Sequence, residues 1–208
     1  LGLLKLNLPS LLFGTGMAIP WSALASVNIA SSHIVEDMKL GFDLAIAGHP
    51  PMLCPDIKVL GQLPATGSAA KSQRTRWEHG HLKIMQEYFP RLLVQGLKQK
   101  RYDILALGLD LSIPPLSLLV VIWSIFMGLA IAIGLLDTGW EIALLGSISG
   151  ILLFTTIGIS WFRFARSDVS LTDLTRAGLY IIWKLPLYLR FIKKPESNWI
   201  RTERTKNE

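Results

Sequence analysis

Cysteine is almost absent from the sequence, since Cys54 is the only one among 208 residues. An internal disulfide framework is therefore excluded. A single thiol is typical of a chain whose folded part faces a reducing compartment. Because unpaired cysteines are usually buried in folded proteins, we expect Cys54 to be a buried structural thiol.

Signals for a metal site and for secretion are lacking as well. The four histidines, His33, His49, His79 and His81, show no zinc-type spacing, and no two aspartates lie two residues apart. No basic segment with a short apolar core and a cleavage site appears in the first residues, so we do not interpret them as a secretory signal. We therefore predict no metal ligands in this sequence and interpret Leu1 as a cut within a larger protein.

Charge is missing from one long stretch. Half of the residues are hydrophobic and the net formal charge is +6, yet residues 111–136 contain no charged side chain. That run exceeds the roughly 20 apolar residues that cross a bilayer. A second apolar stretch, 142–162, follows a short turn at 137–141. Because both outer flanks are basic and the turn is not, the positive-inside rule places both flanks in the cytoplasm.

Two further segments are expected at the membrane surface. Residues 174–192 are apolar but contain Lys184 and Pro186 and precede a basic tail, which a spanning helix would carry to the far side. We therefore favour an interfacial helix there, with a third span as the alternative. The helical residues 88–101, interrupted by Pro90, carry leucines on one side and basic residues on others.

The first hundred residues have the pattern of an α/β fold. The first strand bends at Gly14-Thr15-Gly16, where glycine allows close approach of the backbone. One helix opens with the acidic pair Glu36-Asp37 and closes on Gly48. The predicted elements are strands at 11–19 and 52–60 and helices at 21–27, at 31–48 and from residue 68 onward.

Three short motifs precede the apolar stretches: Phe13-Gly14-Thr15-Gly16, Val35-Glu36-Asp37 and Gln73-Arg74-Thr75-Arg76-Trp77. Positions 73, 76 and 77 share one face of a helix. In this order the motifs resemble the processive family-2 glycosyltransferases of the cellulose, chitin and hyaluronan synthase type, which carry an acidic pair and a Gln-x-x-Arg-Trp motif before carboxy-terminal spans. The resemblance covers about residues 10–90 by motif and the rest by architecture.

The resemblance implies a hexosyltransferase-type enzyme that transfers a sugar, with inversion, from a nucleotide-diphosphate donor to a glycan acceptor during polysaccharide synthesis. A sugar hydroxyl is a poor nucleophile, so a carboxylate must take its proton. The resemblance assigns this base to Asp37, beside Glu36, and places Trp77 beneath the acceptor sugar. The other residues that it implies for binding the acceptor or the diphosphate are Gln73, Arg74, Arg76, Gly14 and Thr15.

Each motif also has a purely structural interpretation. An acidic pair stabilises a helix start through the helix dipole. The Gln73 run fits an amphipathic helix with Trp77 in the core, and the glycine bend fits an ordinary strand end. The order of the three motifs ahead of the apolar stretches favours the enzyme.

The resemblance also implies a domain plan and partners. A donor-binding half with an Asp-x-Asp element holding Mg²⁺ or Mn²⁺ is expected upstream, because this sequence has none. The partners are the nucleotide sugar, a glycan or lipid acceptor, the inner or plasma membrane and secretion or channel subunits, with no nucleic acid. The plan comprises the carboxy-terminal part of a GT-A-type catalytic domain (1–88), an interfacial region (89–110), two transmembrane helices (111–165), an interfacial or third membrane helix (166–192) and a basic cytoplasmic tail (193–208).

Two other functions stay open. The first is a non-processive transferase that glycosylates a membrane lipid, since the family's Phe-x-Val-Thr-like gating segment is not recognisable after the second apolar stretch. The second is a non-catalytic membrane scaffold that retains degenerate motifs.

Overall fold

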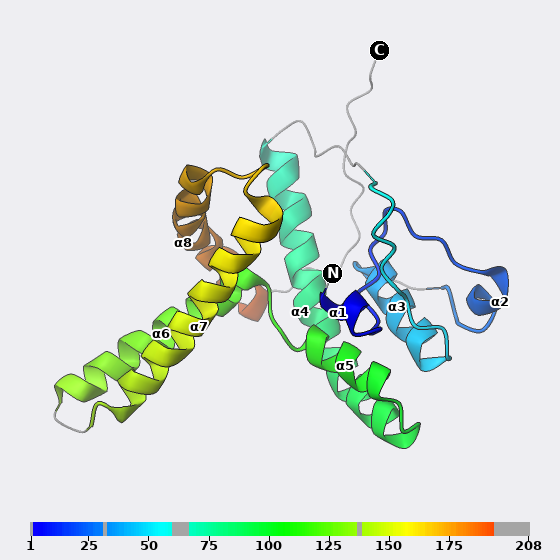
Figure 1. Ribbon diagram of the computed structural model, residues 1–208, viewed down its shortest axis with the longest axis horizontal. Coiled ribbons are helices and arrows are strands. Elements are labelled where there is room, and N and C mark those ends of the chain that lie inside the picture. Colours follow the sequence, from blue (N-terminus) through cyan, green and yellow to red (C-terminus); the bar gives the residue numbers. More distant parts are fainter. Residues whose placement is uncertain (1, 31–32, 60–66, 137–138, 194–208) are drawn as a thin grey trace, which may run out of the picture. The chain divides into compact units, whose positions relative to one another are not determined.

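The computed structural model describes residues 2–30, 33–59, 67–136 and 139–193 (Figure 1). The chain divides into two compact units, which we call the amino-terminal unit (1–114 with 191–208) and the hairpin unit (115–190). The helices of the described residues are α1 (Gly2–Lys5), α2 (Trp21–Leu24), α3 (Glu36–Ile46), α4 (Gly67–Lys98), α5 (Tyr102–Leu111), α6 (Leu116–Leu135), α7 (Glu141–Ser160), the π-helix η1 (Trp161–Ala165) and α8 (Leu171–Lys193).

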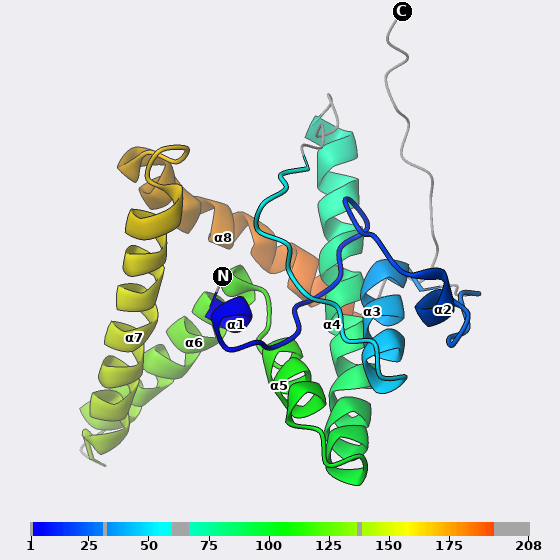
Figure 2. The ribbon, with the colours of Figure 1, turned by 45° about the vertical axis from the view of Figure 1, so that its right-hand side comes forward.

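The core of the amino-terminal unit is formed by buried side chains of α3, α4 and α5, the three helices that Figure 2 shows near one another. The chain turns back after α4, and α5 packs closely on α4. Gly96 makes this packing possible, since a Cβ at that position would lie 2.7 Å from the Leu105 side chain. Apolar side chains recur at helical spacing on each helix and face the other two. The buried cluster comprises Val35, Met38, Phe42, Ala45, Ile84, Tyr88, Leu92, Ile104, Leu107 and Leu111.

The α/β fold predicted from the sequence is wrong. Within the described residues the segments 11–19 and 52–59 form extended loops and no strand. They lie near each other, and Ser10 N–H donates a 3.0 Å hydrogen bond to the Pro51 carbonyl. A sheet needs a ladder of such bonds, and the three prolines between residues 50 and 55 have no N–H to donate. The first loop packs on the helices at Leu11 and Leu12, whereas Phe13, Ile57 and Val59 are exposed.

Two other expectations also differ from the structure. Pro90 does not interrupt the helix, because α4 continues to Lys98. The loss of one backbone hydrogen bond at Pro90 is tolerated where Tyr88 and Leu92, on either side, are buried in the core. Cys54 is exposed rather than buried, since it lies in the proline-rich loop and not on a helix face.

The hairpin unit contains α6 and α7 packed side by side (Figures 1 and 2). Both helices are long and apolar enough to cross a membrane by length and composition. Gly146 and Gly150 on α7 allow the close packing that is typical of small residues four positions apart. The Trp123 indole lies against Gly150 and donates a 3.0 Å hydrogen bond to the Gly146 carbonyl, and its ring meets Phe154 edge-on at 5.1 Å.

Gly150→Leu is expected to destabilise this hairpin, because any side chain at position 150 collides with the Trp123 indole. Overpacking of this kind costs about 1–3 kcal/mol. The midpoint of thermal unfolding of the detergent-purified protein measures the effect. Gly128→Leu on α6 is the matched control, since a side chain there meets nothing within 4 Å. Equal shifts for both variants would contradict the packing argument.

Helix α8 is continuous through Pro186. Within the hairpin unit it contacts the start of α6, where Ser117 Oγ lies 2.6 Å from Tyr188 Oη and accepts a 3.1 Å hydrogen bond from Lys184 Nζ. Lys184, whose charge argued against a third span, thus has a hydrogen-bond partner within the protein. Whether α8 lies at the surface or spans stays a prediction. The predicted turn residues 137–138 and the basic tail from 194 lie outside the described residues.

Candidate active site

The structure brings the glycine bend and the acidic pair together. The backbone N–H of Gly14 donates a 2.6 Å hydrogen bond to Asp37 Oδ2, and the two residues are 23 positions apart in the chain. A Cβ at position 14 would lie 3.2 Å from the same carboxylate oxygen. A side chain at position 14 would therefore press on the Asp37 carboxylate and shift it. The sequence motif did not identify Asp37 as the neighbour of the glycine bend.

The carboxylate of Asp37 is fixed but not saturated. Its other oxygen, Oδ1, accepts a 2.9 Å hydrogen bond from the backbone N–H of Met38, in the first turn of α3. Two oxygens offer about four acceptor positions, so each retains a lone pair for an incoming hydroxyl. Glu36 and Thr15 are exposed nearby in the chain, and the acidic pair begins α3 as predicted.

The start of α3 rests on α4 at a second glycine. A Cβ at Gly80 would lie 2.7 Å from Val35 Cγ1, so only glycine allows the two elements to approach this closely. Val35 is the N-cap residue of α3, two positions before Asp37. Gly80 was not identified from the sequence, although an isolated glycine inside a predicted helix is a signal of close approach.

The Gln73 run lies on α4, one turn before Gly80, as the spacing predicted. Trp77 has 51 % of its surface exposed, which is inconsistent with the alternative that its ring lies in the core. Gln73 and Arg76 are half-buried and Arg74 is exposed. The contact nearest to both motifs is the one between Gly80, three residues after Trp77, and Val35, two residues before Asp37.

A polar network holds α3 on α4. Asp43 accepts hydrogen bonds from Lys39 Nζ at 2.7 Å and from Tyr88 Oη at 3.1 Å, and Arg91 lies 3.4 Å from the same carboxylate. The hydrogen bond to Asp43 raises the pKa of Lys39. Burial, together with Asp43, raises the pKa of Tyr88, so its hydroxyl stays protonated and donates. The network positions the helix that carries Asp37.

A second titratable group lies on α4 one turn after Trp77. His81 Nε2 is buried with no hydrogen-bond partner among the described residues. Burial lowers the pKa of His81, while Glu78 and Asp110 oppose that change. Burial likewise raises the pKa of Asp110 on α5, and His81 opposes it. The pair was not identified from the sequence, because α4 and α5 bring it together only in the fold.

Stability is expected to fall as the pH decreases below about 6.5. The folded pKa of His81 is depressed below 6.5, so in that window the unfolded chain binds more protons and stability is lost with acidification. The slope is below about 1.4 kcal/mol per pH unit, the limit for one proton. Asp110 has the opposite effect on stability. The stability that it contributes is fully present below pH 3.8 and is lost as the pH rises through its raised folded pKa.

Unfolding midpoints at mildly acidic and neutral pH measure this dependence. In His81→Gln the unfolding midpoint is expected to fall less on acidification than in the wild type. His49→Gln, which changes an exposed imidazole, is expected to show the same fall as the wild type. An unchanged slope in His81→Gln would refute the assignment.

Among the described residues no group of three or more His, Cys, Asp or Glu side chains is placed to hold a metal ion. No curated protein and no solved structure matches the chain. A family model does match, over residues 4–166, a range that contains the glycine bend, the acidic pair, the Gln73 run and both apolar helices; the chain belongs to glycosyl transferase family group 2.

Proposed function

We propose that the protein transfers a sugar, with inversion, from a nucleotide-diphosphate donor to a glycan acceptor, as a polysaccharide synthase of the cellulose, chitin and hyaluronan synthase type. Membership of the family supports glycosyl transfer in general. The observation on which the more specific proposal depends is the Asp37 carboxylate, held by the Gly14 N–H at 2.6 Å. Asp37 lies on α3, which packs against α4, the helix that also contains the Gln73 run.

In this mechanism Asp37 is the general base. The acceptor hydroxyl donates its hydrogen bond to a free lone pair of the carboxylate, and its oxygen attacks the anomeric carbon. The proton moves to Asp37 as the new C–O bond forms and the bond to the diphosphate breaks on the opposite face. The hydrogen bonds from Gly14 and Met38 keep the carboxylate from rotating, so it is oriented before the acceptor arrives.

The Gln73 run supplies the surface for the acceptor and the diphosphate. The exposed Trp77 ring offers an apolar face on which a pyranose stacks. Arg76 and Arg74 offer planar sets of donors for the negative charge of the leaving diphosphate. Gln73 lies one turn before Trp77 on α4 and donates to sugar hydroxyls.

The Mg²⁺ or Mn²⁺ expected for this reaction does not fit the described residues, because they provide no set of three ligands. No step above is routed through a cation. Its ligands are proposed to lie outside the described residues, together with the nucleotide-binding part of the site.

The reaction is proposed to occur at the cytoplasmic face of the inner or plasma membrane. The two apolar helices support membrane association, and the basic flanks support a cytoplasmic catalytic part. Helices α6 and α7 then form a transmembrane hairpin beside which a growing glycan leaves, with secretion or channel subunits as partners.

Labelled nucleotide sugars, supplied one at a time to membranes that contain the full-length protein, test this proposal. A labelled polymer is the expected product. A labelled lipid carrying one sugar would replace the synthase by a non-processive transferase, and the absence of transfer from every donor would favour the scaffold. Matched membranes without the protein are the control.

A further inference from the structure

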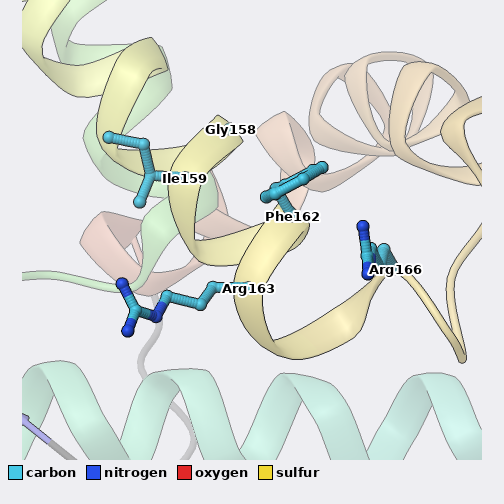
Figure 3. Close-up of a pocket in the computed structure, with 5 residues that line it drawn as sticks. All are labelled: Gly158, Ile159, Phe162, Arg163 and Arg166. Atoms are coloured by element: carbon cyan, nitrogen blue, oxygen red, sulfur yellow. The ribbon is translucent and has the colours of Figure 1, made fainter.

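The carboxyl end of α7 contains a pocket that the proposed reaction does not use. Its volume is about 470 Å³, and it lies wholly within the hairpin unit. Figure 3 shows the five side chains or backbone positions that line it, and all of them belong to the last turn of α7, to η1 or to the residue that follows η1. They are Gly158, Ile159, Phe162, Arg163 and Arg166.

A π-helix gives this end of α7 its shape. Residues 161–165 form η1, a wider helical turn of a kind that is frequent at functional sites. The indole N–H of Trp161 donates a 2.8 Å hydrogen bond to the Val169 carbonyl, and the Val169 N–H donates at 2.8 Å to the Ala165 carbonyl. The chain after η1 is thus tied back to it, which fixes Arg166 near the end of α7.

The two arginines lie on different sides of the Phe162 ring. The Arg166 guanidinium is 4.7 Å from the ring centroid, in a cation–π contact, whereas Arg163 extends along the other side of the helix (Figure 3). Both side chains are exposed, and within the described ranges no carboxylate forms an ion pair with either of them. The pocket therefore carries two uncompensated positive charges.

The remaining wall is apolar and accessible. Ile159 and Phe162 each have 59 % of their surface exposed, and a Cβ at Gly158 would meet nothing within 4 Å. A ligand that satisfies both parts has an anionic group next to a hydrocarbon chain. Anionic phospholipids have this composition, and basic pockets at the cytoplasmic ends of membrane helices bind their head groups.

We propose that this pocket binds an anionic phospholipid, with its head group attracted by the charges of Arg163 and Arg166 on either side of Phe162 and the start of its acyl chain along Gly158, Ile159 and Phe162. Arginine is suited to this role because its planar donors bind phosphate oxygens in pairs. The site rests on the membrane insertion of α6 and α7 proposed above. It is independent of the identity of the sugar.

Native mass spectrometry of the full chain in detergent tests the site, with phosphatidylglycerol and phosphatidylcholine of identical acyl chains as probes. The wild-type protein is expected to retain phosphatidylglycerol roughly tenfold more strongly than phosphatidylcholine. Arg163→Gln/Arg166→Gln is expected to abolish this preference. Lys98→Gln/Lys100→Gln removes the same charge from the exposed end of α4 and is expected to keep it.

A steric variant tests the pocket without changing charge. Gly158→Leu fills the open space beside Phe162 and is expected to lower phosphatidylglycerol binding to the level of the arginine variant. Gly128→Leu, at an equally open glycine on α6, is the matched control and is expected to bind as the wild type does. Unfolding midpoints equal to the wild type confirm that the variants remain folded.

Several results would overturn the site. They are equal retention of both lipids by the wild type, an equal loss in the arginine and lysine variants, and displacement of phosphatidylglycerol by millimolar inorganic phosphate, which would indicate a phosphate ion as the ligand. Carbonate extraction of the wild-type membranes separates this inference from the proposed insertion. Protein that stays in the membrane but shows no lipid preference refutes the pocket alone.

Discussion

Asp37→Asn is expected to lower the rate of sugar transfer about 10²–10⁴-fold, the range for loss of a general base. Asparagine has the same shape, and its side-chain oxygen still accepts the hydrogen bond from the Gly14 N–H. The fold of the site is therefore retained, while the group that takes the acceptor proton is lost. Initial rates with labelled donor in membranes of equal protein content measure the effect.

The control for this variant is Asp56→Asn, which removes one carboxylate from an exposed turn of the same unit. Its transfer rate is expected to equal that of the wild type. Gly14→Ala is expected to give a transfer rate between those of the wild type and Asp37→Asn. The added methyl group lies 3.2 Å from Asp37 Oδ2 and displaces the carboxylate without removing it. Full activity of Asp37→Asn, in a protein that inserts normally, would refute Asp37 as the general base.

Trp77→Ala is expected to reduce kcat/KM for the acceptor roughly ten- to a hundredfold, because the sugar loses the ring on which it stacks. Since the lost contact is with bound acceptor, the effect is expected mainly in KM for the acceptor and not in KM for the donor. Trp77→Phe keeps an aromatic face and is expected to lose about threefold. Steady-state rates at varied acceptor concentration separate these outcomes.

Trp21→Ala is the matched control, since Trp21 lies among the described residues of the amino-terminal unit, is 78 % exposed, more than Trp77, and belongs to the short helix α2. An equal loss in Trp21→Ala and Trp77→Ala would mean that exposed tryptophans act through stability or membrane contact. Unchanged acceptor kinetics in Trp77→Ala would remove the stacking role.

Helices were predicted from the sequence with more success than strands. The helix opened by Glu36-Asp37 and the helix carrying the Gln73 run are both present. Their apolar residues recur at helical spacing within a short stretch of sequence, and α3, α4 and α5 bury these residues together. The strand assignment at 11–19 was wrong, since apolar residues on either side of a glycine bend occur equally in an exposed loop. Prolines in the other segment were the signal against a sheet.

The candidate site was predicted by residue type but not by contact. The glycine bend was expected to let the backbone approach something, and the structure identifies the neighbour as Asp37. Gly80 and the pair of His81 and Asp110 were missed, because their importance depends on contacts between helices. Such long-range contacts have no local pattern, and an isolated glycine is the weak signal that could have indicated one of them.

The hydrogen bond between Gly14 and Asp37 also closes a loop of chain that includes α2. The free energy of closing such a loop changes by only about 0.6 kcal/mol when its length doubles. Residues between the two ends can therefore be inserted or deleted at little cost while the carboxylate stays in place. Sequences grafted between Thr15 and Glu36 are therefore expected to leave the proton acceptor undisturbed.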